Sequence, residues 1–178
     1  PDFLEDGAGA IAWAVSHAAE LGADPQRIVL VGHSAGAYNA VMLGLDGRYL
    51  DAAGVDPGAI RAVAGLAGAY DFLPLEGRLT PPIFGAAADL EATQPLAHAS
   101  RRSPPAFLAT GEDDQVVEAR NTLALAQALR DQGAVVETAL SRPLRGRAPV
   151  LDDMVAFLRR QVGLGDQVAM RHDREALP

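Results

Sequence analysis

The sequence contains no cysteine, and this absence excludes several kinds of chemistry. A disulfide framework, a thiolate zinc site and a cysteine nucleophile all require a residue that the chain does not contain. Long hydrophobic runs are missing too, since none approaches the roughly 20 residues that a membrane-spanning helix needs. We therefore expect no membrane span. No signal peptide is recognisable, so we expect a cytoplasmic protein, although a leader removed before Pro1 would not be visible in this sequence.

Positive charge is scarce: 15 Lys and Arg stand against 23 Asp and Glu, which gives a formal net charge of −8. This acidic balance argues against nucleic acid as a partner. The one basic cluster, at Arg142, Arg145 and Arg147, is better explained as a charged loop than as a phosphate-binding surface. With 49% hydrophobic and 21% charged residues, the 178 residues are expected to form one globular domain. The composition indicates nothing about the oligomeric state.

Helix and strand patterns alternate along the chain. Apolar residues recur at spacings of three and four over 3–21, which predicts a helix that Asp2 caps and Gly22 ends. The unbroken aliphatic run over 28–31 is typical of a strand buried on both faces. The later predicted elements are a helix over 37–45, a strand over 59–66, a strand over 106–109, a helix over 118–132, a strand from Val135 and a helix over 149–160.

This alternation predicts an α/β fold with a mostly parallel sheet and helices on both of its faces. The predicted domain covers residues 1–162. Within it, residues 70–104 are rich in Pro, Gly and Ala and are expected to make an excursion over the sheet. Residues 163–178 are expected to form a polar tail.

Between the first strand and the second helix stands the motif Gly32-His33-Ser34-Ala35-Gly36, in the strand–turn–helix context that gives a G-x-S-x-G sequence its meaning. We expect Ser34 at the point of a strained turn, with the two glycines leaving room for the strand and the helix. The Ala35 N–H could then donate to an oxyanion. We therefore predict Ser34 as the nucleophile and Ala35 as an oxyanion donor. His33, adjacent to Ser34, cannot readily reach back to the hydroxyl and is expected to be a packing or hydrogen-bonded flank.

An acidic loop follows the third strand, on the same edge of a parallel sheet as the serine. A carboxylate there can orient an imidazole and stabilise the imidazolium that forms when the serine gives up its proton. Asp114 is our choice, because it precedes the apolar pair Val116-Val117, which we expect to pack the loop down. Asp113 and, less favoured, Glu112 are the alternatives. A solvated turn that caps the next helix would explain the acidic residues without a catalytic role.

These motifs resemble the α/β-hydrolase superfamily, in its small carboxylesterase branch related to hormone-sensitive-lipase-like esterases. The resemblance runs through most of residues 3–160 and includes the stretches 3–8, 27–39, 68–72, 111–117 and 149–158. It implies an α/β-hydrolase fold and a Ser–His–Asp triad that contains Ser34 and Asp114. It also implies a small carboxylic ester as substrate, with no metal and no cofactor.

Two parts that the resemblance implies are missing from the sequence. Only 27 residues precede Ile28, too few for the earlier strands and for the glycine-rich loop that supplies a second oxyanion donor. No histidine lies between His98 and His172, where the family places its catalytic histidine, so the triad histidine is unknown. The strand from Val135 is also expected to be cut short by a break near Glu137–Thr138.

Three explanations stay open for these gaps. Pieces of the natural protein are missing from this sequence, the protein is a non-catalytic relative, or His172 reaches back from the tail. We expect the 178 residues by themselves to be nearly inert, and the uninterrupted natural protein to hydrolyse p-nitrophenyl esters. His17 and His98 are expected to be structural or solvated.

Two other functions compete with ester hydrolysis. A formamidase or amidase, such as a kynurenine formamidase, shares this architecture, and a catalytically silent binding module would keep the fold without the reaction. Candidate walls of an acyl pocket lie in the excursion, where an ordinary core role is equally compatible with the sequence. These residues are Phe72, Leu73, Leu75, Ile83 and Phe84.

Overall fold

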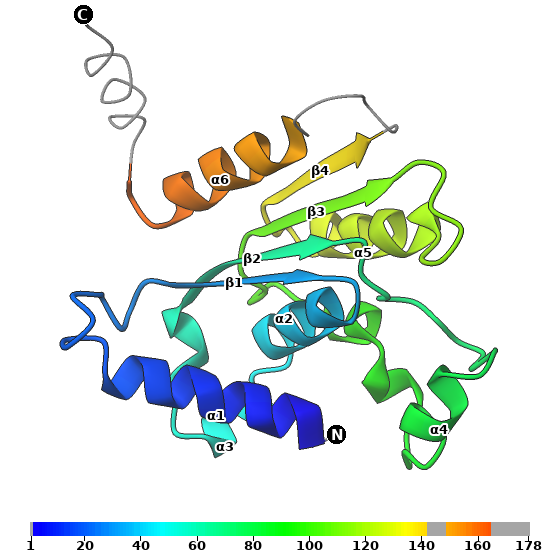
Figure 1. Ribbon diagram of the computed structural model, residues 1–178, viewed down its shortest axis with the longest axis horizontal. Helices are drawn as coiled ribbons and strands as arrows, with labels where there is room; N and C mark the ends of the chain where they lie inside the picture. The colour runs from blue at the N-terminus through cyan, green and yellow to red at the C-terminus, as the bar shows by residue number, and fades with distance from the viewer. Residues whose placement is uncertain (1, 142–148, 165–178) are drawn as a thin grey trace, which may run out of the picture.

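Four parallel strands form one sheet with the spatial order β1-β2-β3-β4 (Figure 1). The structure, a computed structural model, describes residues 2–141 and 149–164. The strands are β1 (Ile28–His33), β2 (Ile60–Leu66), β3 (Ala106–Gly111) and β4 (Val136–Ser141). The α-helices are α1 (Asp2–Ser16), α2 (Ala35–Leu45), α3 (Arg48–Ala52), α4 (Thr80–Phe84), α5 (Ala119–Asp131) and α6 (Pro149–Gln161). Three short 3₁₀ helices, η1 (Pro57–Ala59), η2 (Glu91–Thr93) and η3 (Pro95–His98), complete the described elements.

Helices cover both faces of the sheet, as the sequence predicts. Helices α1, α2 and α5 lie on one face, and α6 lies on the other (Figure 1). Side chains of a strand point alternately to the two faces. In β3, Ala106 and Leu108 therefore enter the core beneath α2 and α5, whereas Phe107 and Ala109 enter the core beneath α6.

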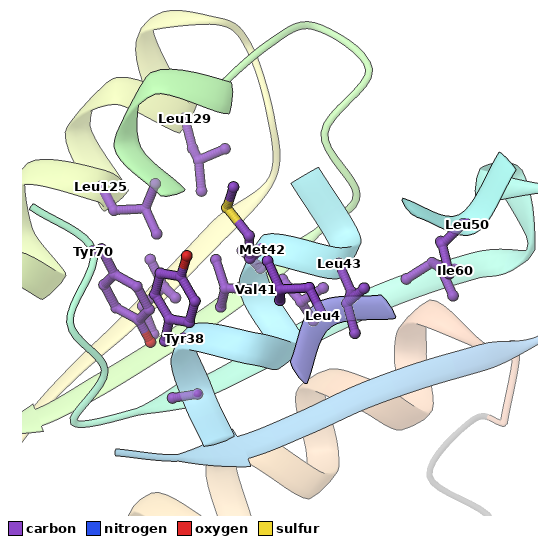
Figure 2. Packing of buried hydrophobic residues seen from close by; sticks show 14 of the residues in the cluster. Leu4, Tyr38, Val41, Met42, Leu43, Leu50, Ile60, Tyr70, Leu125 and Leu129 are labelled. Carbon is purple, nitrogen blue, oxygen red and sulfur yellow. The ribbon is translucent and has the colours of Figure 1, made fainter. Parts of the chain in front are cut away.

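The larger core lies between the sheet and the layer that α1, α2 and α5 form (Figure 2). Its largest buried side chains come from α1, α2, α3 and α5, from β2 and from the loop after β2. Those labelled in Figure 2 are Leu4, Tyr38, Val41, Met42, Leu43, Leu50, Ile60, Tyr70, Leu125 and Leu129. The smaller core is centred on Phe107 and Phe157, whose ring centroids lie 5.9 Å apart. β2 and β3 are the central strands of the described sheet, and most of their residues are buried.

The strand that carries the nucleophile motif is not buried on both faces, which corrects the sequence prediction. β1 is an edge strand of the described sheet, and Val31 is 48% exposed. An unbroken aliphatic run indicates that a strand is apolar on both faces, but the neighbouring elements decide whether both faces are covered. By contrast, β4 is not cut short: Glu137 and Thr138 both lie inside it, in register with Phe107 and Leu108.

Helix α1 ends earlier than the apolar pattern predicts. It stops at Ser16, and residues 17–22 form turns up to Gly22, whose φ is +65°. The Ser16 hydroxyl donates to the Trp13 carbonyl oxygen at 2.8 Å. Side chains that bond to helix carbonyls in this way compete with the backbone pattern. Asp2 belongs to the helix itself instead of standing before it as a cap.

The excursion over 70–104 packs against helices rather than directly over the sheet. Its η3 segment contacts α2 and α5, and the Tyr38 hydroxyl on α2 donates to the Thr93 carbonyl oxygen at 2.9 Å. Phe72 and Phe84, two of the predicted pocket walls, make ring contacts with Tyr38 at 5.9 and 5.5 Å between centroids. Ile83, a third, is exposed. The excursion is therefore attached to the helix that follows the nucleophile motif.

Asp46, at the C-terminal end of α2, is a buried carboxylate held by Arg48. Its two oxygens accept from Arg48 Nε at 2.9 Å and from Arg48 Nη2 at 2.7 Å, and His98 Nδ1 lies 3.9 Å from Oδ2. Burial alone would raise the pKa of Asp46, but the hydrogen bonds from Arg48 outweigh it and hold the pKa below its usual value. A carboxyl group whose pKa is lower in the folded state stabilises that state above its unfolded pKa.

We expect this stabilisation to be lost as the pH falls from about 4 through the lowered pKa of Asp46. Asp46→Asn should lower the free energy of unfolding at pH 7 by about 1 kcal/mol, because the Arg48 end of the pair is exposed to solvent. The loss of stability between pH 5 and pH 3 should also be smaller in this variant. Urea unfolding at several pH values measures both effects, with Asp51→Asn on the exposed face of α3 as the control. An identical acid profile in Asp46→Asn and the parent would contradict the assignment.

Candidate active site

Ser34 occupies the turn between β1 and α2 in a conformation that side chains rarely adopt. Its φ is 54° and its ψ is −122°. The Ser34 N–H donates to the Leu66 carbonyl oxygen at 2.8 Å, and its own carbonyl oxygen accepts from the N–H groups of Ala37 and Tyr38. Such a backbone costs about 1–3 kcal/mol and persists only where the surroundings enforce it. The strained turn that the sequence predicts is present, and Ser34 is only partly buried.

The two glycines of the motif are not equivalent. A Cβ on Gly32 would overlap the carbonyl carbon and oxygen of Gly36, so the strand and the helix approach too closely for any side chain there. A Cβ on Gly36 would meet no atom within 4 Å in the described part of the chain. The prediction that both glycines leave room for close approach is therefore right for Gly32 and wrong for Gly36.

This difference gives a prediction with an internal control. Gly32→Ala should distort the turn and lower the free energy of unfolding by several kcal/mol, because the overlap is with backbone that cannot move without breaking the start of α2. Gly36→Ala should change stability by less than about 1 kcal/mol, and the methyl group even favours the helix. Thermal unfolding of the two variants checks the contrast. Equal midpoints for both would show that the close approach at Gly32 is absent.

The Ala35 N–H is available at the start of α2. The first N–H groups of a helix have no partner within the helix, and no acceptor for this one is found among the described residues. Ala35 is exposed, so a substrate oxygen could approach its amide. The helix also places the positive end of its dipole here. The Ala35 N–H could therefore donate to an anionic oxygen beside Ser34, and the dipole of α2 would stabilise the negative charge on that oxygen.

Asp114 lies in the loop after β3, at the same edge of the sheet as Ser34. Its Oδ1 accepts from the N–H groups of Val116 at 2.8 Å and Val117 at 3.0 Å. These bonds, from Val117 and then Val116, lower the pKa of Asp114 below its ordinary value, and the electrostatic interaction with nearby His33 acts in the same direction. Asp114 is therefore a carboxylate at neutral pH. Its second oxygen, Oδ2, forms no hydrogen bond with another described residue, so it is free to accept from a base.

The packing argument that favoured Asp114 over its neighbours is wrong in one respect. Val116 is 90% exposed and does not hold the loop down. The loop is held instead by the hydrogen bonds that Asp114 accepts and by the Glu112 N–H, which donates to the Ser141 carbonyl oxygen at 2.9 Å. Asp113 and Glu112 are both exposed, whereas Asp114 is partly buried.

The described histidines differ in their surroundings. His33 is exposed and forms no hydrogen bond with another described residue, so the expected packing or hydrogen-bonded role is not seen. His17 stacks on Trp13 with ring centroids 4.4 Å apart, and His98 Nε2 bonds to the Ala92 carbonyl oxygen at 2.8 Å, so both have structural contacts. His172 lies outside the described residues, as do Arg142, Arg145 and Arg147 in the segment between β4 and α6.

Two amide side chains near this edge of the sheet were not predicted from the sequence. Asn121 and Gln94 accept hydrogen bonds from the backbone of residues 70–72. A sequence signal existed for Asn121, because it stands four and eight residues before Leu125 and Leu129 on the buried face of α5. A polar residue on an apolar face indicates a specific buried partner. No comparable signal marks Gln94, which lies in the irregular excursion.

None of the helices in the described part of the chain is both long and apolar enough to cross a membrane. No group of three or more His, Asp or Glu side chains in residues 2–141 and 149–164 is arranged to hold a metal ion.

The sequence and the fold of this chain are both similar to those of known esterases. Esterase LipQ of Mycobacterium tuberculosis is 30% identical over 158 residues, which span 75% of this chain and 35% of LipQ. The chain spans about a third of the length of the curated relatives that it matches. Carboxylesterase Cest-2923 of Lactobacillus plantarum has a TM-score of 0.72 and 18% identity, covering 90% of this chain and 68% of its own.

A thermophilic esterase of Thermogutta terrifontis, Est2, also has a TM-score of 0.72, with 23% identity over 93% of this chain and 65% of its own. These likenesses show that the parallel sheet with its two helical layers is an α/β-hydrolase fold, as the sequence predicts. A model of the BD-FAE family matches residues 1–129. Because that match covers well over half of the chain, this chain belongs to the BD-FAE family.

Proposed function

We propose that this chain carries the nucleophile and the acid of a serine carboxylesterase that cleaves small carboxylic esters. The observation that carries the proposal is the conformation of Ser34, which has a positive φ at the end of β1 and is followed by the free N–H of Ala35. Strain of this kind concentrates at functional sites. The relatives LipQ and Cest-2923 are named an esterase and a carboxylesterase, which supports the same chemistry for the protein that contains this chain.

In the proposed reaction, Ser34 Oγ attacks the ester carbonyl carbon while a histidine takes its proton. The negative charge that develops on the carbonyl oxygen is stabilised by the Ala35 N–H, and one such donor is typically worth about 10²–10³ in rate. The protonated histidine then gives its proton to the departing alcohol, which leaves an acyl ester on Ser34. Water cleaves this ester by the same steps and regenerates the serine hydroxyl.

Asp114 has the properties that the third member of the triad needs. It is ionised at neutral pH, and Oδ2 is free to accept from an imidazole N–H, which fixes the ring and stabilises its charged form. β1 and β3 are separated by β2 alone, so Ser34 and the Asp114 loop stand about two strand spacings apart, roughly 10 Å. An imidazole that bonds on both ring nitrogens can bridge a gap of this order. No described residue is assigned as that histidine.

The direct test is covalent labelling of the natural full-length protein with a fluorophosphonate, followed by peptide mapping. We expect the label on Ser34, because only an activated serine hydroxyl reacts rapidly with such a probe. Labelling should be lost in Ser34→Ala and retained in Ser16→Ala, which removes an exposed hydroxyl on α1. A protein that takes no label at Ser34 would instead be a silent binding module.

Ester and formamide hydrolysis are separated by a second measurement. The rates on p-nitrophenyl acetate or butyrate and on N-formylkynurenine should be compared under the same conditions. We expect the aryl esters to react faster, since the named relatives are esterases. A higher kcat/KM for N-formylkynurenine would replace the esterase proposal by a formamidase.

A further inference from the structure

Two buried amide side chains hold three consecutive backbone N–H groups of the loop that follows β2. The N–H groups of Tyr70 and Asp71 both donate to Asn121 Oδ1 at 2.9 Å, and the Phe72 N–H donates to Gln94 Oε1 at 2.8 Å. Asn121 is 5% exposed and Gln94 is 4% exposed. We call these two residues the amide clamp. Because buried donors without acceptors are costly, the clamp decides where the backbone of residues 70–72 can lie.

On one side, the clamped loop supports the strand next to the nucleophile. The Tyr70 ring is fully buried, and its hydroxyl lies against Gly65 and Gly68, where a Cβ on either glycine would overlap it. Gly65 pairs with Gly32 across the sheet. The next residue of β2, Leu66, supplies the carbonyl oxygen that accepts from the Ser34 N–H. The position of Tyr70 is thus transmitted through β2 to the backbone of Ser34.

On the other side, Asn121 is fixed to the end of the acid loop. Its backbone N–H donates to the Glu118 carbonyl oxygen at 3.0 Å, and its Nδ2 donates to the same oxygen at 3.3 Å. Glu118 precedes α5 and ends the loop that carries Asp114. An ion pair between Arg120 and Asp71, with Nη1 and Oδ2 3.3 Å apart, joins the same two segments at the surface.

We propose that Asn121, assisted by Gln94, is a positioning residue that sets the backbone of Ser34 relative to the Asp114 loop. This inference rests on the proposed esterase function. The clamp touches neither the serine hydroxyl nor a substrate, and it acts through Tyr70 and Leu66 on one side and through Glu118 on the other. Displacement of a reacting group by about 1 Å can cost 10²-fold in rate, so a clamp at this place has a large effect on catalysis.

Loss of the acceptor on Asn121 should therefore lower kcat more than it changes KM. We expect Asn121→Ala in the natural full-length protein to reduce kcat for p-nitrophenyl acetate by about 10–100-fold, with KM within about threefold of the parent. Asn121→Asp keeps an oxygen acceptor for both N–H groups and should recover most of the rate. Gln94→Ala should act in the same direction but less strongly, because it releases one N–H group instead of two.

The control is Gln127→Ala, which removes an exposed amide from the same helix; its Nε2 donates to Asp131 Oδ1 at 2.7 Å. A second readout needs no substrate: the amide resonances of Ser34 and Ala67 in ¹⁵N-labelled protein. Ala67 follows Leu66 at the end of β2, and its N–H donates to the Ala109 carbonyl oxygen at 2.7 Å. We expect both to shift in Asn121→Ala, to return toward the parent in Asn121→Asp and to be unchanged in Gln127→Ala. If Asn121→Ala does not fold, Gln94→Ala and Asn121→Asp give the same comparison.

The two proposals fail in different ways. A parent protein that neither hydrolyses esters nor labels at Ser34 ends the esterase proposal, and the resonances of Ser34 and Ala67 still test the clamp. Unfolding at a lower temperature in Asn121→Ala, with kcat and both resonances equal to those of the parent, would show that the clamp is a folding contact only and would overturn the inference.

Discussion

Replacement of Ser34 by alanine should lower kcat for aryl esters by about 10⁶-fold in the natural full-length protein, because removal of the nucleophile from a serine hydrolase leaves only about 10³–10⁴ over water. The side chain of Ser34 forms no hydrogen bond with another described residue, and its backbone bonds do not depend on the hydroxyl. Stability should therefore be almost unchanged. Hydrolysis of p-nitrophenyl acetate measures the first effect, and thermal unfolding measures the second.

A smaller loss would point to another nucleophile. If Ser34→Ala kept more than a tenth of the parent rate while folding normally, the strained turn would have to serve a purpose other than attack on a carbonyl. The 178 residues by themselves give a further check. They should be nearly inert, because no histidine lies between His98 and His172, where the catalytic base is expected. Strong activity that survives His172→Ala would contradict that expectation.

Replacement of Asp114 by asparagine should lower kcat by about 10⁴-fold. The asparagine oxygen can still accept from the N–H groups of Val116 and Val117, so the loop keeps its shape. What is lost is the negative charge that orients an imidazole and stabilises its protonated form. The measurement is kcat against pH for the parent and the variant, in a range where the lowered pKa of Asp114 keeps the parent carboxylate ionised.

The matched control is Asp113→Asn, which removes the same charge from the neighbouring, exposed position. We expect it to change kcat by less than about twofold, because long-range effects of exposed charges are weak at ordinary salt. If Asp113→Asn were the more damaging of the two, the acid would be Asp113 and the hydrogen bonds that Asp114 accepts would serve only to shape the loop.

Sequence patterns located the elements well where the signal is local. The run over 28–31, the small residues around Ser34 and the apolar spacing of α5 predict a strand, a tight turn and a helix within one or two residues of those observed. Turn chemistry and side-chain periodicity act over a few neighbouring residues, so they can be read from a short stretch. The early end of α1 is the exception, since side-chain bonds at Ser16 and His17 interrupt an otherwise helical pattern.

The burial of individual residues is harder to predict from sequence than the positions of the helices and strands. β1 and Val116 were both expected to be covered because they are apolar, yet β1 is an edge strand of the described sheet and Val116 faces solvent. Apolar composition states only that burial would be favourable, whereas the neighbours that provide it come from distant parts of the chain. The same reason applies to Gly36: a close approach depends on the facing element, and no described atom lies within 4 Å of a Cβ placed there.

Residues that are adjacent in the chain are enough to predict the strand–turn–helix unit around Ser34, because the apolar run and the small residues of the motif form one local pattern. Which backbone groups hold the turn and the acid loop in place depends on the packing of distant segments. The Ser34 N–H donates to the Leu66 carbonyl oxygen, and the Tyr70 N–H donates to Asn121 Oδ1, 51 positions away in the sequence. Hydrogen bonds over such separations form when packed layers bring their donors and acceptors together, and no local pattern of residues records that geometry.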